Sequence, residues 1–207
     1  MIYMTNAPSK SIIITQVFLI FILPVMLLYS NILSGGWRIV MLAIGSLLIY
    51  GIIHHENWSH EDMGVRDDNL MESLPYYLLF TVIGSILMFL IAYNVNIYGT
   101  REQGFLFRTF ILFLPISFFQ EFAFRSFLIP RLKAIFSNTY LVIFTNAILF
   151  ALIHIIYPSI NIGLPMTFIG GIFFAWLYLK YPNFLLISLA HSALNITAVL
   201  LGFFNIN

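Results

Sequence analysis

The chain has 207 residues, of which 61% are hydrophobic and 8% are charged, and its formal net charge is +1. Soluble domains have about 25% charged residues, so this composition excludes an ordinary water-soluble protein and indicates a membrane protein. The small net charge gives no sign of nucleic-acid binding, and the absence of cysteine excludes disulfides, thiolate chemistry and cysteine-ligated metals.

Apolar runs long enough to cross a bilayer, roughly 17–25 residues each, follow one another along the chain. We place them at residues 11–29, 37–53, 74–93, 104–129, 139–155, 163–179 and 183–203. The second, fifth and sixth runs are short enough to be re-entrant or tilted. The sequence therefore predicts an all-α fold, a polytopic transmembrane helix bundle of about seven spans, within a range of six to eight, built as a single structural unit.

Residues 1–103 supply the N-terminal helices and contain the one long connection. Its residues 54–73 hold six of the eight acidic residues and three of the five histidines. Possible metal ligands occur there, namely His54, His55, Glu56, His60 and Asp62. Because their spacing matches no ligand signature, we interpret the segment as a solvated polar loop.

Lysine and arginine residues in the loops set the expected orientation in the membrane. If the N-terminus is cytoplasmic, cytoplasmic segments hold Lys10, Arg66, Arg131, Lys133 and Lys180, and outer segments hold Arg38, Arg101 and Arg108. This excess predicts a multi-pass protein of the cell membrane with a cytoplasmic N-terminus. Arg131 and Lys133 contribute most of that preference.

The stretch FFQEFAFRSF, residues 118–127, places charge inside the fourth apolar run. An ionisable group at mid-membrane costs at least about 2–3 kcal/mol and is by default a functional-site hypothesis. Glu121 and Arg125 are four residues apart on one helix face, so each can neutralise the other. A purely structural ion pair therefore stays open beside a functional one.

Two later apolar runs also carry polar side chains. His154 ends the stretch FALIH, and His191 and Asn195 lie four residues apart in HSALN. Polar groups in lipid must face the bundle interior and find partners, so we expect these residues to converge with Gln120 and Glu121 on one cavity. There a carboxylate can deprotonate water, imidazoles can hold the water or protonate a leaving amine, and a carboxamide can stabilise an oxyanion. These are the parts needed to hydrolyse a peptide bond.

The signatures of other intramembrane hydrolases are missing. The stretch HENWS, residues 55–59, lacks the second histidine of a zinc-binding H-E-x-x-H motif. The sequence has no G-x-S-G motif for a serine nucleophile, and no aspartate lies within an apolar run. A zinc, serine or aspartyl protease is therefore not predicted.

Three motifs resemble those of the CPBP family, the CAAX proteases and bacteriocin-processing enzymes also called Abi proteins, which includes the type II CAAX prenyl endopeptidases. That family has E-E-x-x-x-R in one helix, F-x-x-x-H in the next and H-x-x-x-N near the end. Here QEFAFR occupies residues 120–125, FALIH residues 150–154 and HSALN residues 191–195, within a core of residues 104–203. The stretch MGVRDD, residues 63–68, also resembles the segment that often precedes this core.

The resemblance implies an intramembrane endopeptidase of the glutamic type, in which a glutamate-activated water attacks a peptide bond near the membrane surface. It places the catalytic positions at Gln120, Glu121, His154, His191 and Asn195, and supporting roles at Arg125 and Phe150. No metal is assigned, although His154 and His191 are possible ligands. The implied partners are a peptide or membrane-protein substrate and the lipid bilayer, with no nucleic acid.

Gln120 departs from the family pattern, because the first glutamate of the motif is the residue thought to activate the water. A carboxamide has no useful basicity and cannot act as a general base. Glu121 remains, but it is rotated by about 100° around the helix. The chain can therefore be a natural member without protease activity, an enzyme in which Glu121 has taken over, or a chain with an introduced inactivating substitution.

The sequence leaves several functions open. We expect an endopeptidase by ancestry with little or no turnover, in which Gln120→Glu would produce cleavage. The alternative is a non-catalytic membrane scaffold or bacteriocin-immunity protein that binds a peptide in the same cavity. A small transporter with Glu121 as a proton relay is a further alternative.

Overall fold

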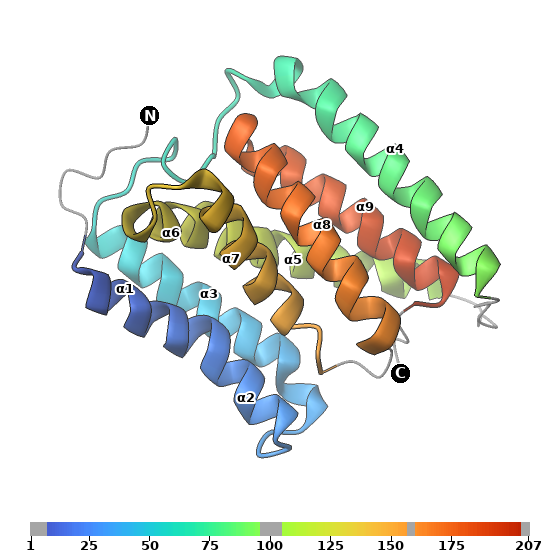
Figure 1. Ribbon diagram of the computed structural model, residues 1–207, viewed down its shortest axis with the longest axis horizontal. Coiled ribbons are helices and arrows are strands. Elements are labelled where there is room, and N and C mark those ends of the chain that lie inside the picture. Colours follow the sequence, from blue (N-terminus) through green and yellow to red (C-terminus); the bar gives the residue numbers. More distant parts are fainter. Residues whose placement is uncertain (1–7, 96–104, 157–159, 204–207) are drawn as a thin grey trace.

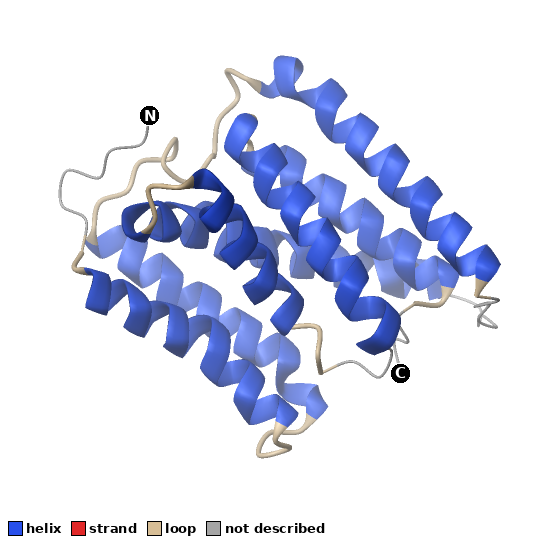
Figure 2. Cartoon of the chain, viewed as in Figure 1, coloured by secondary structure: helices blue, strands red, loops and turns tan. Residues whose placement is uncertain are grey.

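The computed structural model describes residues 8–95, 105–156 and 160–203, and every regular element in these ranges is a helix (Figure 2). The prediction of an all-α polytopic bundle is confirmed. Six helical stretches are long and apolar enough to cross a membrane, namely Lys10–Tyr29, Gly35–His55, Leu70–Asn94, Thr109–Ile135, Ile160–Lys180 and Phe184–Leu201. The predicted run at 139–155 forms a shorter apolar helix, Thr139–Leu152.

Several of the spans are built from more than one element. The first contains α1 (Lys10–Val17), the π-helix η1 (Phe18–Ile22) and α2 (Leu23–Tyr29), and the second contains the 3-10 turn η2 (Gly35–Trp37) and α3 (Arg38–His55). After α4 (Leu70–Asn94), the central span is formed by α5 (Phe105–Glu121), the π-helix η3 (Phe122–Leu128) and α6 (Ile129–Ile135). The remaining helices are α7 (Thr139–Leu152), α8 (Ile160–Lys180) and α9 (Phe184–Leu201).

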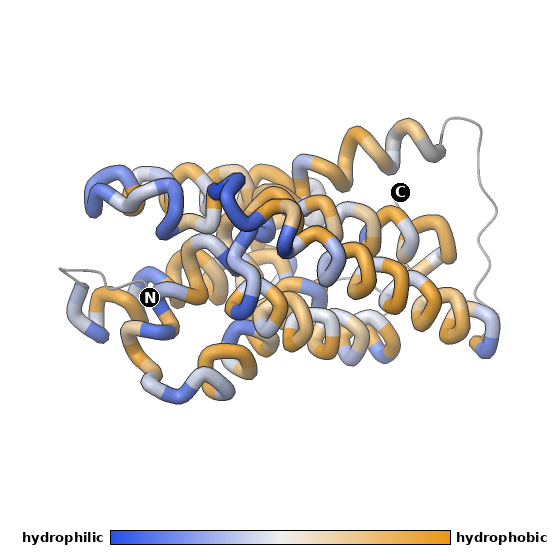
Figure 3. Tube along the Cα trace, turned by 90° about the horizontal axis from the view of Figure 1, so that it is seen from above, coloured by the Kyte–Doolittle hydropathy of each residue, from blue (hydrophilic) through white to orange (hydrophobic). Residues whose placement is uncertain are grey.

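The helices form two groups on either side of a central element. Figure 1 shows α1, α2 and α3 together at one side and α4, α8 and α9 at the other, with α5 running between them. Helix α5 packs against α9, α9 packs against α4, and α7 packs against α8. Apolar residues cover most of each helix, and hydrophilic residues gather at helix ends and in connections (Figure 3). The central helix is therefore the element from which a buried side chain can reach both groups.

The two π-helices each precede a proline by two residues. Pro24 follows η1 and Pro130 follows η3. A proline has no N–H to donate and its ring clashes with the carbonyl four residues earlier, so the regular α-helical ladder cannot continue through it. A local widening to the π form accommodates such a break and is frequent at functional sites. Glu121 lies directly before η3 and Arg125 lies inside it.

The long loop after α3 is attached to the bundle, so the interpretation of it as solvated is wrong for part of its length. The carbonyl of Met63 accepts hydrogen bonds from Ser126 Oγ at 2.7 Å and from the Tyr178 hydroxyl at 2.9 Å. The backbone N–H of Phe184 donates to the carbonyl of Gly64 at 2.8 Å. Gly64 has a φ of +71°, and a Cβ there would lie 2.3 Å from the Tyr178 hydroxyl oxygen, so the contact needs glycine.

Arg131 is buried and lies on a helix, so its assignment to a loop is wrong, while its side of the membrane stays a prediction. The helix continues past Pro130 to Ile135, and the Arg131 side chain is 0% exposed. Its Nη2 lies 2.7 Å from both carboxylate oxygens of Glu56. A cytoplasmic N-terminus stays a prediction, while the multi-pass character of the chain is supported by the six spans.

Candidate active site

Glu121 is the centre of a buried charged cluster formed by α5, η3 and α9. The side chain is 0% exposed. Its Oε2 lies 3.2 Å from Nε of Arg125, and its Oε1 lies 2.6 Å from Nδ1 of His191. Both contacts are close enough for ion pairs, although neither is aligned as a hydrogen bond. The carboxylate therefore faces a fixed cation on one side and an imidazole on the other.

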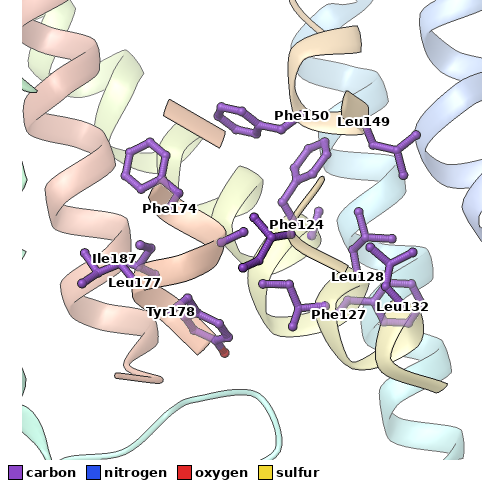
Figure 4. Packing of buried hydrophobic residues seen from close by; sticks show 14 of the residues in the cluster. Phe124, Phe127, Leu128, Leu132, Leu149, Phe150, Phe174, Leu177, Tyr178 and Ile187 are labelled. Carbon is purple, nitrogen blue, oxygen red and sulfur yellow. The ribbon is translucent and has the colours of Figure 1, made fainter. Parts of the chain in front are cut away.

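Aromatic rings surround the guanidinium of Arg125, which is also 0% exposed. Its Cζ lies 4.5 Å from the ring centroid of Phe150, 5.2 Å from that of Phe174 and 5.9 Å from that of Phe124. Figure 4 shows these three rings projecting from η3, α7 and α8 into one buried cluster. A cation over aromatic faces is attracted by the ring quadrupole, more strongly when it is desolvated. The three rings and Glu121 therefore both stabilise the buried Arg125 cation.

His154 and His191 both contact the phenyl ring of Phe150. The ring centroid of Phe150 is 5.2 Å from that of His154 and 5.5 Å from that of His191. His154 follows the end of α7, and its Nδ1 lies 2.8 Å from the Phe150 carbonyl oxygen. Only a protonated Nδ1 can donate to that oxygen, so the contact assigns the proton of the neutral ring to Nδ1. The structure brings both histidines to the aromatic wall of the Glu121 cluster.

Asn195 lies one turn after His191 on α9 and extends the same face. Its Nδ2 donates to Oγ of Ser117 at 3.1 Å. Ser117 lies four residues before Glu121 on α5, one turn away along the same helix. The two helices are therefore joined by two successive polar contacts, Ser117 with Asn195 and Glu121 with His191.

Gln120 faces a different space from Glu121. It lines a cavity of about 120 Å³ whose walls come from α2, α3, α5 and the segment after α7. Glu121, His154, His191 and Asn195 are not among the residues that line this cavity. The reason is the helical repeat, because successive residues of a helix point in directions about 100° apart. We expected one cavity lined by all five residues. Among them, only Gln120 lines this cavity.

Comparison with known families adds an independent observation on the same part of the chain. Residues 102–197 match the family model described as type II CAAX prenyl endopeptidase Rce1-like. This chain carries an Rce1-like region. The family inferred from the three motifs is thereby confirmed for this region. Comparison with curated proteins and with solved structures gives no match.

The Rce1-like region contains every candidate residue from Gln120 to Asn195. A family of membrane proteases implies a peptide substrate and a site embedded in the bilayer. The family match does not extend to residues 1–101, which contribute α1 to α4 and the loop that holds Arg131. Helix α3 lies outside the matched residues, but it forms part of the wall of the cavity at Gln120.

Two polar residues near the cluster were missed by sequence reasoning. Asn146, buried in α7, donates from Nδ2 to the carbonyl of Phe124 in η3 at 2.7 Å. Ser126, next to Arg125, donates to the loop carbonyl of Met63. An asparagine inside an apolar run is a recognisable signal, since polar groups in a bilayer must find partners. The role of Ser126 had no signal, because its partner lies 63 residues away in the sequence.

The donor set of the Rce1-like region does not fit a metal ion. Within the described ranges, no group of three or more histidine and acidic side chains is arranged to hold one. The possible ligands of the loop, which lie within the described ranges, form no such group either, namely His54, His55, Glu56, His60 and Asp62. Arg125 would also place a positive charge beside any ion bound by Glu121 and His191. We therefore derive no chemical step through a metal.

Proposed function

We propose that this chain is an intramembrane endopeptidase in which His191 activates a water molecule and Glu121 orients His191. The observation that carries the proposal is the 2.6 Å contact between Glu121 Oε1 and His191 Nδ1 in a buried site. A carboxylate on one ring nitrogen of a histidine is the arrangement used to orient and charge-stabilise a general base in serine hydrolases. Membership of residues 102–197 in a membrane-protease family supports a peptide as the substrate.

The proposed reaction begins with the tautomer of His191. The Glu121 carboxylate favours a proton on Nδ1, which leaves the lone pair of Nε2 to accept a proton from water. The water oxygen then forms a bond to the carbonyl carbon of the peptide, and the resulting imidazolium is stabilised by Glu121. Collapse of the tetrahedral intermediate breaks the C–N bond, and the proton passes to the leaving amine. Arg125 lies 3.2 Å from the Glu121 carboxylate and offsets its charge in the buried site.

Two further side chains support the intermediate in this proposal. Asn195 Nδ2 carries two hydrogens, of which one is directed to Ser117, so the second can donate to the oxyanion. His154, whose proton lies on Nδ1, is proposed to orient the leaving amine by accepting a hydrogen bond from it at Nε2. Gln120 has no part in the proton transfers, since a carboxamide is not a base and the side chain lines a separate cavity.

A cleavage assay on the full chain tests the assignment of the base. The protein in detergent micelles is incubated in ¹⁸O-water with a mixed library of membrane-tethered peptides, and new C-termini are identified by mass spectrometry. We expect ¹⁸O in the new carboxylates and a loss of about 10²–10⁴-fold in His191→Ala. Gln120→Glu should not raise the rate. Cleavage that appears only in Gln120→Glu would contradict the proposal and place the base at residue 120, as the family resemblance implies.

A non-catalytic peptide-binding protein is the second candidate, and the observation that favours it is Gln120 itself. The family motif has a glutamate at that position, and this chain has a residue that binds but does not accept protons. In that case neither the unaltered chain nor Gln120→Glu releases any ¹⁸O-labelled terminus. Retention of a peptide from the same library on the immobilised protein would then establish the binding function.

A further inference from the structure

The cavity at Gln120 contains a polar side chain that makes no hydrogen bond to the described residues. The Gln120 side chain is 9% exposed and lines the cavity, and it makes no hydrogen bond to any residue in the described part of the chain. Its amide atoms are not among the fully buried polar atoms, so they are accessible to a ligand in the cavity. Most of the surrounding wall is aliphatic or aromatic. Such a site is completed by a ligand that has an apolar body and a group able to hydrogen-bond with the carboxamide.

We propose that this cavity is a specificity pocket that receives a leucine-sized apolar side chain of the bound peptide, while Gln120 holds the adjacent peptide bond. A glutamine carboxamide presents a donor and an acceptor side by side, which matches the N–H and C=O of an extended peptide. The inference rests on the proposed function, because it concerns the peptide that the same region would cleave. It assigns Gln120 to substrate binding instead of to proton transfer.

The size of the cavity sets the size of the side chain. A dry apolar cavity of about 150 Å³ accommodates benzene. The cavity at Gln120 is about 120 Å³, so it suits a leucine or isoleucine side chain and is too small for tryptophan. The wall on α3 includes residues from Arg38 to Ser46, a distance of about 12 Å along the helix axis. The pocket therefore extends along α3 toward its N-terminal end.

Arg38 contributes to the chemistry of the pocket as a cation in its wall. The Nε of Arg38 donates to the carbonyl of Gly35 at 2.7 Å, which holds the side chain near the start of α3. A positive charge in the wall disfavours a lysine or arginine side chain as the occupant. Ser46, whose Oγ donates to the carbonyl of Leu42, adds no free donor to the pocket. Apolar side chains are thus preferred over basic ones.

Two glycines of α3 provide a matched pair of variants. Gly45 lines the cavity, and a Cβ there would meet only Ile20 Cγ2 at 3.8 Å, an ordinary contact. A leucine at Gly45 would therefore extend into the pocket. Gly51 lies on the same helix but is exposed, and a Cβ there meets nothing within 4 Å. Gly51→Leu is the control for adding a leucine to α3 without filling the pocket.

The test uses an acetylated tetrapeptide amide that contains photo-leucine, the photoreactive diazirine analogue of leucine, added to the full chain in detergent micelles. After irradiation, adducts are located by mass spectrometry. We expect adducts on residues 39–46, a loss of about tenfold or more in Gly45→Leu, and no change in Gly51→Leu. Gln120→Leu should lower the yield about three- to tenfold, because it removes the hydrogen bonds to the peptide. Thermal unfolding shows whether each variant is folded, and Met41→Trp fills the same pocket if Gly45→Leu does not fold.

The outcomes separate this inference from the proposed function. Equal adduct yields in Gly45→Leu and Gly51→Leu, or adducts confined to other helices, would overturn the pocket. Displacement of the probe by excess oleate but not by the unlabelled leucine tetrapeptide would also overturn it, because the occupant would then be a lipid chain. Adducts in the pocket without any peptide cleavage would contradict the proposed function alone. Cleavage without adducts in the pocket would contradict this inference alone.

Discussion

Two arginines lie six residues apart in the central span, and both are fully buried, yet they are held in different ways. Arg131 places Nη2 2.7 Å from both oxygens of Glu56, and Trp58 Nε1 also donates to that carboxylate at 2.9 Å. Arg125 has one ion-pair contact, at 3.2 Å to Glu121, and within the described residues its Nη1 and Nη2 have no hydrogen-bond partner.

From this difference we infer that the Arg131–Glu56 pair is structural and that the Arg125–Glu121 pair belongs to the proposed active site. Charge-assisted hydrogen bonds of about 2.7–2.9 Å are the strong ones, and the Arg131 pair has two of them. The Glu121 carboxylate is instead shared between Arg125 and His191. A carboxylate fully engaged by an arginine would be less able to orient an imidazole. In the proposed mechanism, the looser pairing of Arg125 leaves Glu121 able to orient His191.

Removal of Arg131 should have the largest effect on stability. Arg131→Ala leaves the Glu56 carboxylate without its cation, and breaking a buried pair typically costs about 3–5 kcal/mol. We expect a matching fall in the free energy of unfolding, measured by thermal or denaturant unfolding in detergent. Lys10→Ala, at an exposed lysine of α1, is the control and should stay within about 0.5 kcal/mol.

A double variant checks the cause of that loss. Replacing both partners, as in Arg131→Met with Glu56→Gln, should recover most of the stability, since a buried pair replaced by groups of similar volume is often near neutral. If the double variant is as unstable as Arg131→Ala, the cost comes from lost packing against Trp58 and Phe127 instead of from the ion pair.

Removal of Arg125 should have a smaller effect on stability and a larger effect on activity. Arg125→Ala removes one longer ion-pair contact and three cation–π contacts but leaves the fully buried Glu121 carboxylate beside His191, and we expect a loss of about 3 kcal/mol. Glu121 then also loses its neighbouring cation, which disturbs its contact with His191, so peptide cleavage should fall at least about tenfold at equal amounts of folded protein. Equal cleavage by folded Arg125→Ala and by the unaltered chain would show that Arg125 is only structural.

Loss of one hydrogen bond to the loop between α3 and α4, which contains Glu56, should have the smallest of these effects on stability. Tyr178→Phe removes the hydrogen bond to the Met63 carbonyl, and a typical hydrogen bond contributes about 1 kcal/mol. Tyr140→Phe, at an exposed tyrosine of α7, is the matched control and should be neutral. Earlier proteolysis or faster hydrogen exchange of residues 56–69 in Tyr178→Phe would locate the effect in the loop. No difference between the two tyrosine variants would show that the loop does not depend on this contact.

The helical bundle was predictable because the bilayer imposes it. Apolar runs in the sequence coincide within a few residues with α3, α4, α8 and α9, since each must satisfy its backbone hydrogen bonds internally. The fifth run is the exception, because its helix ends at Leu152 and His154 follows in a turn. Hydrophobicity alone does not show where such a helix ends.

The candidate site was predictable in its residues but not in its arrangement. The spacing of Glu121 and Arg125, and of His191 and Asn195, follows from the helical repeat and places each pair on one face. The contact between Glu121 and His191 depends on how α5 packs against α9, which no local pattern gives. The burial of Arg131 was missed because its partner, Glu56, is 75 residues away in what the sequence presents as a polar loop.

The central claim is that Glu121 acts through His191, and a double-mutant cycle on the cleavage rate tests it most directly. The unaltered chain, Glu121→Gln, His191→Ala and the double variant are compared at equal amounts of folded protein, with ¹⁸O-labelled peptide termini as the readout. Residues that act as one unit are strongly non-additive, so the double variant should be no slower than His191→Ala alone. Losses that multiply in the double variant would mean that the two residues act independently and would contradict the account.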